Sequence, residues 1–225
     1  MIVLVHSGIC DATMWDGFEV PGATAYEIRG FGQTPLPPEG TVSDADDLIE
    51  ALGGEPAILV GASFGGWVCL QVAASRPELV SELVVLGAPL PDHTWSKEMG
   101  EHRAEEERLH EQGDLRGAAA LNADFWLEST EPRERVIDMQ VRAFELQGDS
   151  KAEWTEPDSI DLSKITARTL VGVGELDKQD FHAIAERLAR DIPDAESVVI
   201  EGAGHLPSME RPEATASVIC SFLRI

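Results

Sequence analysis

The chain has 225 residues, of which 43% are hydrophobic and 26% are charged; both values are close to globular averages, so a mainly disordered chain is excluded. Its 41 acidic and 17 basic residues give a formal net charge of -24, which repels nucleic acids and anionic membrane surfaces. The length suits one domain that carries an insertion better than two independent domains.

The cysteines Cys10, Cys69 and Cys220 are too few and too widely spaced for a disulfide framework or a zinc site. Reduced thiols are typical of the cytoplasm, and we expect the protein there. The N-terminal segment has no basic region, and its apolar run is too short for a signal peptide or a membrane span. The sequence therefore predicts no targeting signal.

Short apolar runs rich in β-branched residues predict buried strands at 2–5, 57–60, 83–86, 169–173 and 198–200. Between most of them lie patterns typical of helices, at 42–52, 64–75, 181–190 and 212–223. Strands that alternate with helices favour the α/β class, with a mostly parallel sheet flanked by helices.

The alternation stops between residues 89 and 164, where helix formers dominate and no strand-like run occurs. This pattern predicts a helical cap inserted into a core made of residues 1–88 and 165–225. We expect the aromatic residues of the insertion to pack on the core or to line a pocket beneath the cap. They are Trp95, Phe125, Trp126, Phe144 and Trp154.

The motif Gly61-Ala62-Ser63-Phe64-Gly65 follows the strand predicted at 57–60 and precedes a predicted helix. This is the G-x-S-x-G pattern in the strand, turn and helix context that a nucleophile elbow needs. Glycines permit the tight turn that exposes the serine hydroxyl, and the N–H of Phe64 is placed to donate to a developing oxyanion. Ser63 is therefore the candidate nucleophile.

A serine hydroxyl needs a histidine to take its proton. His205 lies in a glycine-rich loop directly after the strand predicted at 198–200, which places it at the carboxyl edge of the sheet, where ligands gather in such folds. We therefore predict that His205 is the general base. Surface or packing roles are expected for His93, His102, His110 and His182.

A carboxylate is needed to orient the histidine. Asp177 lies just past the strand predicted at 169–173 and is the preferred candidate. Glu175 and Asp180 are its rivals in the same loop.

The loop after the first predicted strand reads His6-Ser7-Gly8-Ile9. We expect it to supply a second oxyanion N–H, from either Gly8 or Ile9. His6 is expected to brace this loop rather than to take part in catalysis.

Five segments in order make the chain resemble the α/β-hydrolase superfamily over nearly its whole length. They are His-Ser-Gly at 6–8, Arg-Gly-Phe-Gly-Gln-Thr at 29–34, the elbow at 61–66, Gly-Glu-Leu-Asp at 174–177 and Gly-Ala-Gly-His at 202–205. The order serine, aspartate, histidine is the one that this fold uses. The chain departs from the family pattern at Ser7 and Thr34, and it begins at what would be the third family strand, so the first two family strands are expected to be missing.

The resemblance is strongest to esterases, enol-lactonases, cofactor-free haloperoxidases and carbon–carbon bond hydrolases. It implies a serine hydrolase that cleaves a small carboxylic ester or lactone through an acyl-enzyme on Ser63. The serine disfavours epoxide hydrolases and haloalkane dehalogenases, which use aspartate at this position. Two alternatives stay open: a carbon–carbon bond hydrolase with polar cap residues such as Arg142 facing the substrate, and a ligand-binding sensor that retains the three residues.

No complete dinucleotide-binding or phosphate-binding glycine motif occurs, so neither a metal nor an organic cofactor is implied. The expected partner is a small-molecule substrate, with no nucleic acid and no membrane. We expect the protein to be a monomer or a homodimer.

Overall fold

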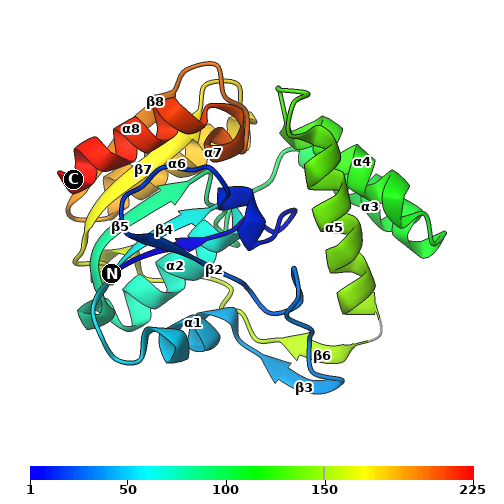
Figure 1. Ribbon diagram of the computed structural model, residues 1–225, viewed down its shortest axis with the longest axis horizontal. Coiled ribbons are helices and arrows are strands. Elements are labelled where there is room, and N and C mark those ends of the chain that lie inside the picture. The colour runs from blue at the N-terminus through cyan, green and yellow to red at the C-terminus, as the bar shows by residue number, and fades with distance from the viewer. Residues whose placement is uncertain (149) are drawn as a thin grey trace.

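A six-stranded sheet forms the centre of the computed structural model, which describes residues 1–148 and 150–225. Every neighbouring pair of its strands runs parallel. In spatial order the strands are β2 (Ala23–Tyr26), β1 (Ile2–Val5), β4 (Ala57–Ala62), β5 (Val80–Leu86), β7 (Arg168–Gly174) and β8 (Ala195–Ile200). The α/β class predicted from the sequence is confirmed (Figure 1).

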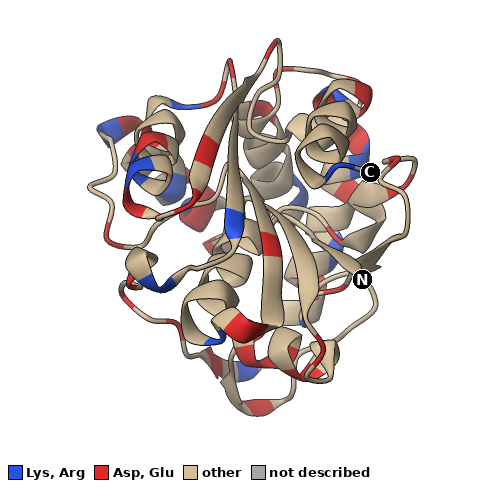
Figure 2. Ribbon diagram, turned by 90° about the vertical axis from the view of Figure 1, so that its left-hand side faces the viewer, with Lys and Arg blue, Asp and Glu red and all other residues tan. Residues whose placement is uncertain are grey.

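Helices cover both faces of this sheet, as its apolar strands require. Figure 2 shows the twisted sheet between its two helical layers. One layer is formed by α1 (Asp44–Leu52), α2 (Phe64–Ser75) and α6 (Gln179–Asp191). The other contains α8 (Pro212–Leu223), with the short α7 (Pro207–Glu210) and the 3-10 turn Ala12–Trp15 beside it.

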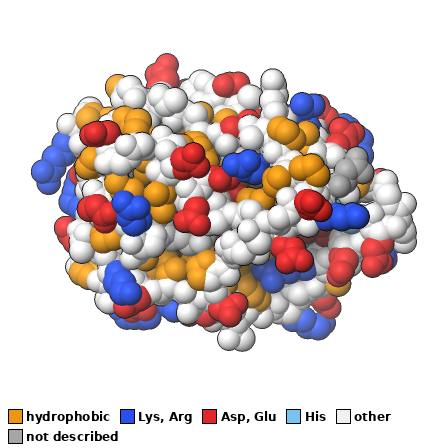
Figure 3. All heavy atoms as spheres, turned by 90° about the horizontal axis from the view of Figure 1, so that it is seen from below, with side chains coloured by type: hydrophobic (Ala, Val, Ile, Leu, Met, Phe, Trp, Pro, Cys, Tyr) orange, Lys and Arg blue, Asp and Glu red, His pale blue; other side chains and the backbone are white. Residues whose placement is uncertain are grey.

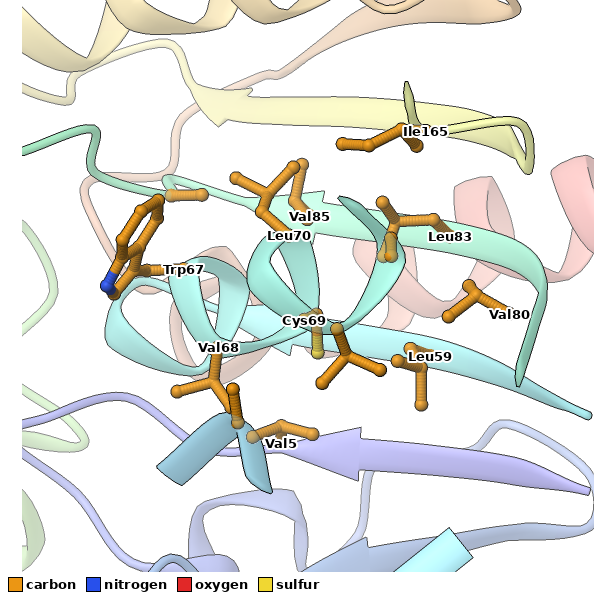
Figure 4. Packing of buried hydrophobic residues seen from close by; sticks show 14 of the residues in the cluster. Val5, Leu59, Trp67, Val68, Cys69, Leu70, Val80, Leu83, Val85 and Ile165 are labelled. Atoms are coloured by element: carbon orange, nitrogen blue, oxygen red, sulfur yellow. The ribbon is translucent and has the colours of Figure 1, made fainter. Parts of the chain in front are cut away.

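Helix α2 is the most deeply buried of these helices, and every residue from 65 to 73 is buried. Figure 4 shows Leu70 of this helix close to Val85 of β5, and Val68 close to Val5 of β1. Burying each such side chain contributes roughly 1.5–3 kcal/mol. The N-terminus of α2, where the motif serine lies, is therefore anchored to the core.

Three helices follow β5 and precede β7, and we call them the cap helices: α3 (Lys97–Glu111), α4 (Leu115–Trp126) and α5 (Arg133–Gly148). They stand beside the carboxyl ends of the strands (Figure 1). The side chain of Ser96 caps α3 by accepting from the N–H of Met99 at 3.3 Å, and Asp114 caps α4 by accepting from the N–H of Gly117 at 2.9 Å.

A second, two-stranded parallel sheet consists of β3 (Glu39–Val42) and β6 (Lys151–Trp154). The prediction that residues 89–164 contain no strand is therefore wrong at β6, and the helix predicted from Val42 begins only at Asp44. Both strands are mostly exposed and have no apolar run, so hydrophobic periodicity does not reveal them. Their pairing joins segments that are far apart in the sequence.

β2 was also not predicted from the sequence. It forms one edge of the large sheet, and Thr24 and Ala25 in its centre are exposed. An edge strand pairs on one side only and needs no continuous apolar run. The sequence pattern therefore reveals the buried central strands better than this one.

Acidic, basic and apolar side chains are interspersed on the face shown in Figure 3. Several arginines pair with two carboxylates each; Arg116, for example, contacts Glu134 and Asp138 at 2.8 Å. Among the described residues, none of the helices has the length and apolar character that crossing a bilayer requires.

Candidate active site

Ser63 occupies the tight turn between β4 and α2. Its backbone has φ 50° and ψ -118°, a region that residues other than glycine rarely adopt and that costs about 1–3 kcal/mol. The N–H of Ser63 donates to the carbonyl oxygen of Leu86 at 2.7 Å, and its carbonyl oxygen accepts from the N–H of Trp67 at 3.1 Å. These bonds hold the serine at the carboxyl end of the sheet in a strained conformation.

Two glycines of the motif are required by close packing around the turn. A Cβ atom at Gly61 would collide with the backbone of Gly65. A Cβ atom at Gly65 would collide with the carbonyl oxygens of Val5 and His6. The start of α2 thus approaches the end of β1 more closely than side chains allow, which brings Ser63 next to the loop that follows β1.

His205 and Asp177 form a hydrogen-bonded chain with Ser63. The Nε2 atom of His205 lies 2.8 Å from Ser63 Oγ, and its Nδ1 atom lies 2.9 Å from Asp177 Oδ2. His205 is 3% exposed and Asp177 is 6% exposed. A carboxylate at Nδ1 holds the ring proton there and leaves Nε2 able to accept the proton of the serine hydroxyl.

Backbone bonds between two loops bring the histidine and the aspartate together. The N–H of Leu176 donates to the carbonyl oxygen of Ala203 at 2.9 Å, and the N–H of Glu175 donates to that of Ile200 at 2.9 Å. These bonds extend the pairing of β7 and β8 beyond the ends of the strands. The loop that carries Asp177 is thereby fixed beside the loop that carries His205.

The rival acids contact other groups. Asp180 accepts hydrogen bonds from the backbone N–H of Ser96 at 2.9 Å and lies 2.9 Å from Nε2 of His93. Glu175 accepts from the backbone N–H of Gly202 at 2.8 Å. Of the three candidate acids, only Asp177 contacts His205.

The loop after β1 lies against the serine turn. A Cβ atom at Gly8 would lie 3.2 Å from the Cβ of Phe64, so the two backbones are close neighbours. The N–H of Ile9 points to Ser7 Oγ at 3.4 Å, whereas that of Gly8 has no acceptor within the described ranges. Gly8 is thus the better placed of the two candidate donors.

His6 braces this loop from beneath. It is fully buried, its Nδ1 donates to the carbonyl oxygen of Ser7 at 2.9 Å, and its Nε2 accepts from the N–H of Ile28 at 3.0 Å. Both ring nitrogens are thus engaged away from Ser63. The position agrees with the bracing role expected from the sequence.

Gly87 is a residue of the site that sequence reasoning missed. It follows β5 with a φ of +57°, and a Cβ atom there would lie 3.1 Å from Cε1 of His205 and 3.4 Å from Oδ2 of Asp177. The signal available in the sequence was a glycine directly after the strand predicted at 83–86. Its lack of a side chain leaves room for the imidazole ring.

Glu210 was also missed. Its buried carboxylate accepts hydrogen bonds from four backbone N–H groups, and burial raises its pKa while those bonds oppose the rise. The donors Glu128 and Ser129, at 2.8 and 2.9 Å, lie just after α4, whereas Gly204 and Leu206, at 3.1 and 3.3 Å, flank His205. A carboxylate in this position ties the histidine loop to the cap.

A cavity of about 610 Å³ lies between the sheet edge and the cap helices. Ser63, His205, Phe64, Gly8 and Ile9 line it from the core. Most of its remaining wall is aromatic or otherwise apolar, and a smaller polar part comes from the cap. A cavity of this size suits a small organic molecule.

The aromatic residues of the insertion divide between lining and packing. Trp95, Trp126, Phe144 and Trp154 line the cavity, whereas Phe125 is absent from its wall and stacks on His102 with ring centroids 3.8 Å apart. His102 is buried and lines the cavity, so of the two roles expected for it the structure fits packing and not a surface location.

Arg142 does not line the cavity, and its guanidinium donates to the carbonyl oxygen of Gly32. Arg142 is therefore not one of the polar cap residues that would face the substrate in the carbon–carbon hydrolase alternative. The described residues contain no group of three or more His, Cys, Asp or Glu side chains suited to a metal ion.

Comparisons with known proteins agree with the resemblance seen in the sequence. Residues 2–218 match the model of the alpha/beta hydrolase family. A thermophilic esterase from Thermogutta terrifontis has a similar structure, with a TM-score of 0.74 and 28% identity, covering 99% of this chain and 89% of that one. The resemblance to this family is thus confirmed.

Two curated relatives carry other activities in their names. Human epoxide hydrolase 4 is 29% identical over 75 residues, which cover only 30% of this chain and 21% of that protein. Proline iminopeptidase PfmaB of Pestalotiopsis fici is 26% identical over 229 residues, which cover 88% of this chain and 80% of that protein. Since one fold supports several hydrolyses, the reaction of this chain has to be argued from its own site.

Proposed function

The chain belongs to the alpha/beta hydrolase family, and from this premise we propose that it cleaves a small carboxylic ester or lactone through an acyl-enzyme on Ser63. The observation that carries the proposal is the hydrogen-bonded chain from Ser63 through His205 to Asp177, with distances of 2.8 and 2.9 Å. A hydroxyl becomes an effective nucleophile when a base at hydrogen-bond distance takes its proton.

The proposed reaction has two steps. Ser63 Oγ attacks the carbonyl carbon while Nε2 of His205 takes the hydroxyl proton, and the imidazolium then gives this proton to the leaving oxygen as the ester bond breaks. In the second step His205 takes a proton from water as the water attacks the acyl-enzyme, and the imidazolium then returns this proton to Ser63 Oγ as the acyl–oxygen bond breaks and the acid leaves. Asp177 stays ionised and stabilises the imidazolium in both steps.

We assign the stabilisation of the negative charge that forms on the carbonyl oxygen to two backbone N–H donors. They are the N–H of Phe64, at the start of α2, and the N–H of Gly8. Donors held in place before the reaction starts stabilise this charge without reorganisation, and losing one of them typically costs a factor of about 100–1000 in kcat. The helix dipole of α2 adds to the same field.

The cavity supports a small substrate with an apolar part. Its volume of about 610 Å³ and its tryptophan and phenylalanine lining favour an acyl or alcohol group with little charge. The 28% identical esterase is a relative of matching chemistry. The carbon–carbon hydrolysis alternative loses Arg142 as a contact to the substrate, since Arg142 bonds to Gly32 instead of lining the cavity, although Arg103 of the cap does line it.

The proposal is tested by steady-state hydrolysis of p-nitrophenyl acetate and butyrate, with a proline p-nitroanilide as an amide comparison. Ser63→Ala and the wild type are assayed together with Ser75→Ala, which changes a serine at the opposite end of the same helix. We expect ester turnover in the wild type and in Ser75→Ala and at least a thousandfold lower kcat in Ser63→Ala.

Equal ester turnover in the wild type and Ser63→Ala would reject the proposed nucleophile. Turnover of the anilide alone would replace the ester by an amide as the substrate class. A burst of one p-nitrophenol per Ser63, followed by slower release, is the kinetic sign of the acyl-enzyme.

A further inference from the structure

The cap side of the cavity contains three buried polar atoms that have no hydrogen-bond partner within residues 1–148 and 150–225. They are Nε2 of His102, Oδ1 of Asn122 and Oε1 of Gln140. These residues are 7%, 2% and 3% exposed, and all three line the cavity. Leaving a buried polar group unsatisfied is unfavourable, so three of them at the cavity indicate a partner from outside the chain.

The three residues come from the three cap helices, one from each of α3, α4 and α5. The cap helices otherwise pack mainly through apolar residues, but each of them presents one polar side chain to the cavity. We call His102, Asn122 and Gln140 the polar subsite.

The hydrogen-bonding direction of Asn122 is fixed by its neighbour. Its Nδ2 donates to Oε1 of Glu106 at 2.6 Å, so the amide presents its oxygen, an acceptor, as the free atom. Burial lowers the pKa of His102, although the Asn122 amide beside it acts in the opposite direction. A neutral imidazole offers one donor and one acceptor, so the pair suits a group that both donates and accepts.

Charged side chains of both signs line the cavity near the polar subsite. Glu106 and Arg103 both line the cavity from α3, and the Arg103 guanidinium lies 4.7 Å over the ring of Trp95. Glu156 also lines it, with its carboxylate accepting from the side-chain nitrogens of Trp67 and Gln71. Arg103 and Glu106 lie three residues apart on α3 and carry opposite charges, so a charged substrate group of either sign would meet a like charge on this wall.

A row of rings connects the subsite to the reacting atoms. The His102 ring lies 5.6 Å from the ring of Trp126, which lies 4.5 Å from the ring of His205. A single tryptophan thus separates the polar subsite from the proposed base. A substrate that reaches both needs an apolar spacer that runs along Trp126.

We propose, building on the ester hydrolysis proposed above, that the polar subsite binds a neutral hydroxyl or amide group that the substrate carries several bonds away from the scissile carbonyl. The group donates its proton to Oδ1 of Asn122 or to Oε1 of Gln140, and its oxygen accepts from Nε2 of His102, while the spacer lies against Trp126. The preferred substrates are then hydroxylated or amide-bearing esters rather than simple alkyl esters.

The test compares esters that differ only at the far end. The acyl series consists of p-nitrophenyl esters of 6-hydroxyhexanoic, 6-acetamidohexanoic and heptanoic acids. The alcohol series consists of 6-hydroxyhexyl, 6-acetamidohexyl and heptyl butyrate, whose hydrolysis is measured by the release of acid. In at least one series we expect a hydroxyl or amide to raise kcat/KM by about three- to tenfold over the alkyl ester. The two polar arms show which group is preferred.

The variants Asn122→Leu and Gln140→Met replace the polar atoms by apolar ones of similar size. We expect each to reduce the kcat/KM ratio of the polar to the alkyl ester to about one, because the apolar side chain offers the far end of the substrate no hydrogen bond. Gln112→Met, an exposed residue at the end of α3 outside the cavity, is the matched control and keeps the preference. Thermal unfolding verifies that the variants fold.

Failure of this proposal is distinguishable from failure of ester hydrolysis. Ser63-dependent turnover without a polar preference overturns the subsite and indicates that water satisfies the three atoms. A stronger preference for an ammonium or carboxylate end also overturns it. If no ester is turned over, the binding of polar and alkyl esters to Ser63→Ala is compared. Tighter binding of the polar esters that is lost when Asn122→Leu is added still supports the subsite. Equal binding of polar and alkyl esters rejects it.

Discussion

The backbone N–H of His205 donates a hydrogen bond to the carbonyl oxygen of Trp126 at 3.1 Å, so the proposed base is tied directly to the last residue of α4. The carboxylate of Glu210 reinforces this connection. It accepts from Glu128 and Ser129 on the cap side and from Gly204 and Leu206 on the histidine side. Cap position and histidine position are therefore mechanically coupled.

Glu210→Gln is predicted to weaken this coupling. A glutamine offers one acceptor oxygen, and its amino group faces backbone donors that it cannot satisfy, so the free energy of unfolding is expected to fall by roughly 1–3 kcal/mol. A displaced His205 lowers kcat more than it raises KM. Urea unfolding and ester kinetics measure the two effects.

Glu213→Gln is the matched control, because Glu213 is an exposed glutamate on the neighbouring helix α8. It is expected to change neither the stability nor kcat appreciably. If Glu210→Gln behaves like Glu213→Gln, the carboxylate has no positioning role.

The two aspartates that follow β7, Asp177 in the loop and Asp180 in the first turn of α6, are predicted to differ sharply in function. Asp177→Asn places an amide at Nδ1 of His205 and no longer holds the reactive tautomer, so kcat is expected to fall by about three to four orders of magnitude. Asp180→Asn alters contacts to His93 and Ser96 and is expected to leave kcat within about threefold. Similar losses of kcat in both variants would contradict the assignment of Asp177.

Gly87→Ala is predicted to damage the site through the added methyl group. The Cβ would press on His205 Cε1 at 3.1 Å, so we expect kcat to fall by about ten- to a hundredfold with KM little changed. Gly54→Ala is the control: its φ of +84° causes similar backbone strain, but a Cβ there meets no atom within 4 Å. Both variants lose about 1 kcal/mol of stability, and only Gly87→Ala loses activity.

The residues that could be predicted from the sequence lie directly after apolar strand-like runs. Ser63, Asp177 and His205 each follow such a run, and in a parallel sheet the carboxyl ends of the strands meet at one edge. Their convergence in space is therefore a consequence of local pattern plus topology. The central strands were visible for the same reason, as their continuous apolar runs are specific to burial on both faces.

The residues that could not be predicted depend on contacts between distant segments. Glu210 lies in an unremarkable Pro-Ser-Met-Glu turn, and its four donors come from two separate loops. Asn122 and Gln140 lie on cap helices whose pattern gives no sign that they face a cavity. β3 and β6 are exposed strands whose pairing is decided by tertiary contact alone.

Asp44 is predicted to make the stability depend on pH. It is 1% exposed at the start of α1; its Oδ2 accepts from Nε1 of Trp154 at 3.1 Å, and its Oδ1 has no partner in the described part of the chain. Burial, followed by the charge of Glu156, raises the pKa of Asp44 from 3.8 to about 7. Between these values the folded protein holds a proton that the unfolded chain has released.

The contribution of Asp44 to stability therefore falls as the pH rises from about 4 to 7, by roughly 2–4 kcal/mol. Asp44→Asn keeps an oxygen for Trp154 and carries no charge, so it should match the wild type near pH 4 and exceed it in unfolding free energy near pH 8. Urea unfolding across this range measures the difference. Asp46→Asn, which changes an exposed residue in the same helical turn, serves as the control. If Asp44→Asn raises the free energy of unfolding by the same amount at every pH, the titration of Asp44 is not the cause of the gain.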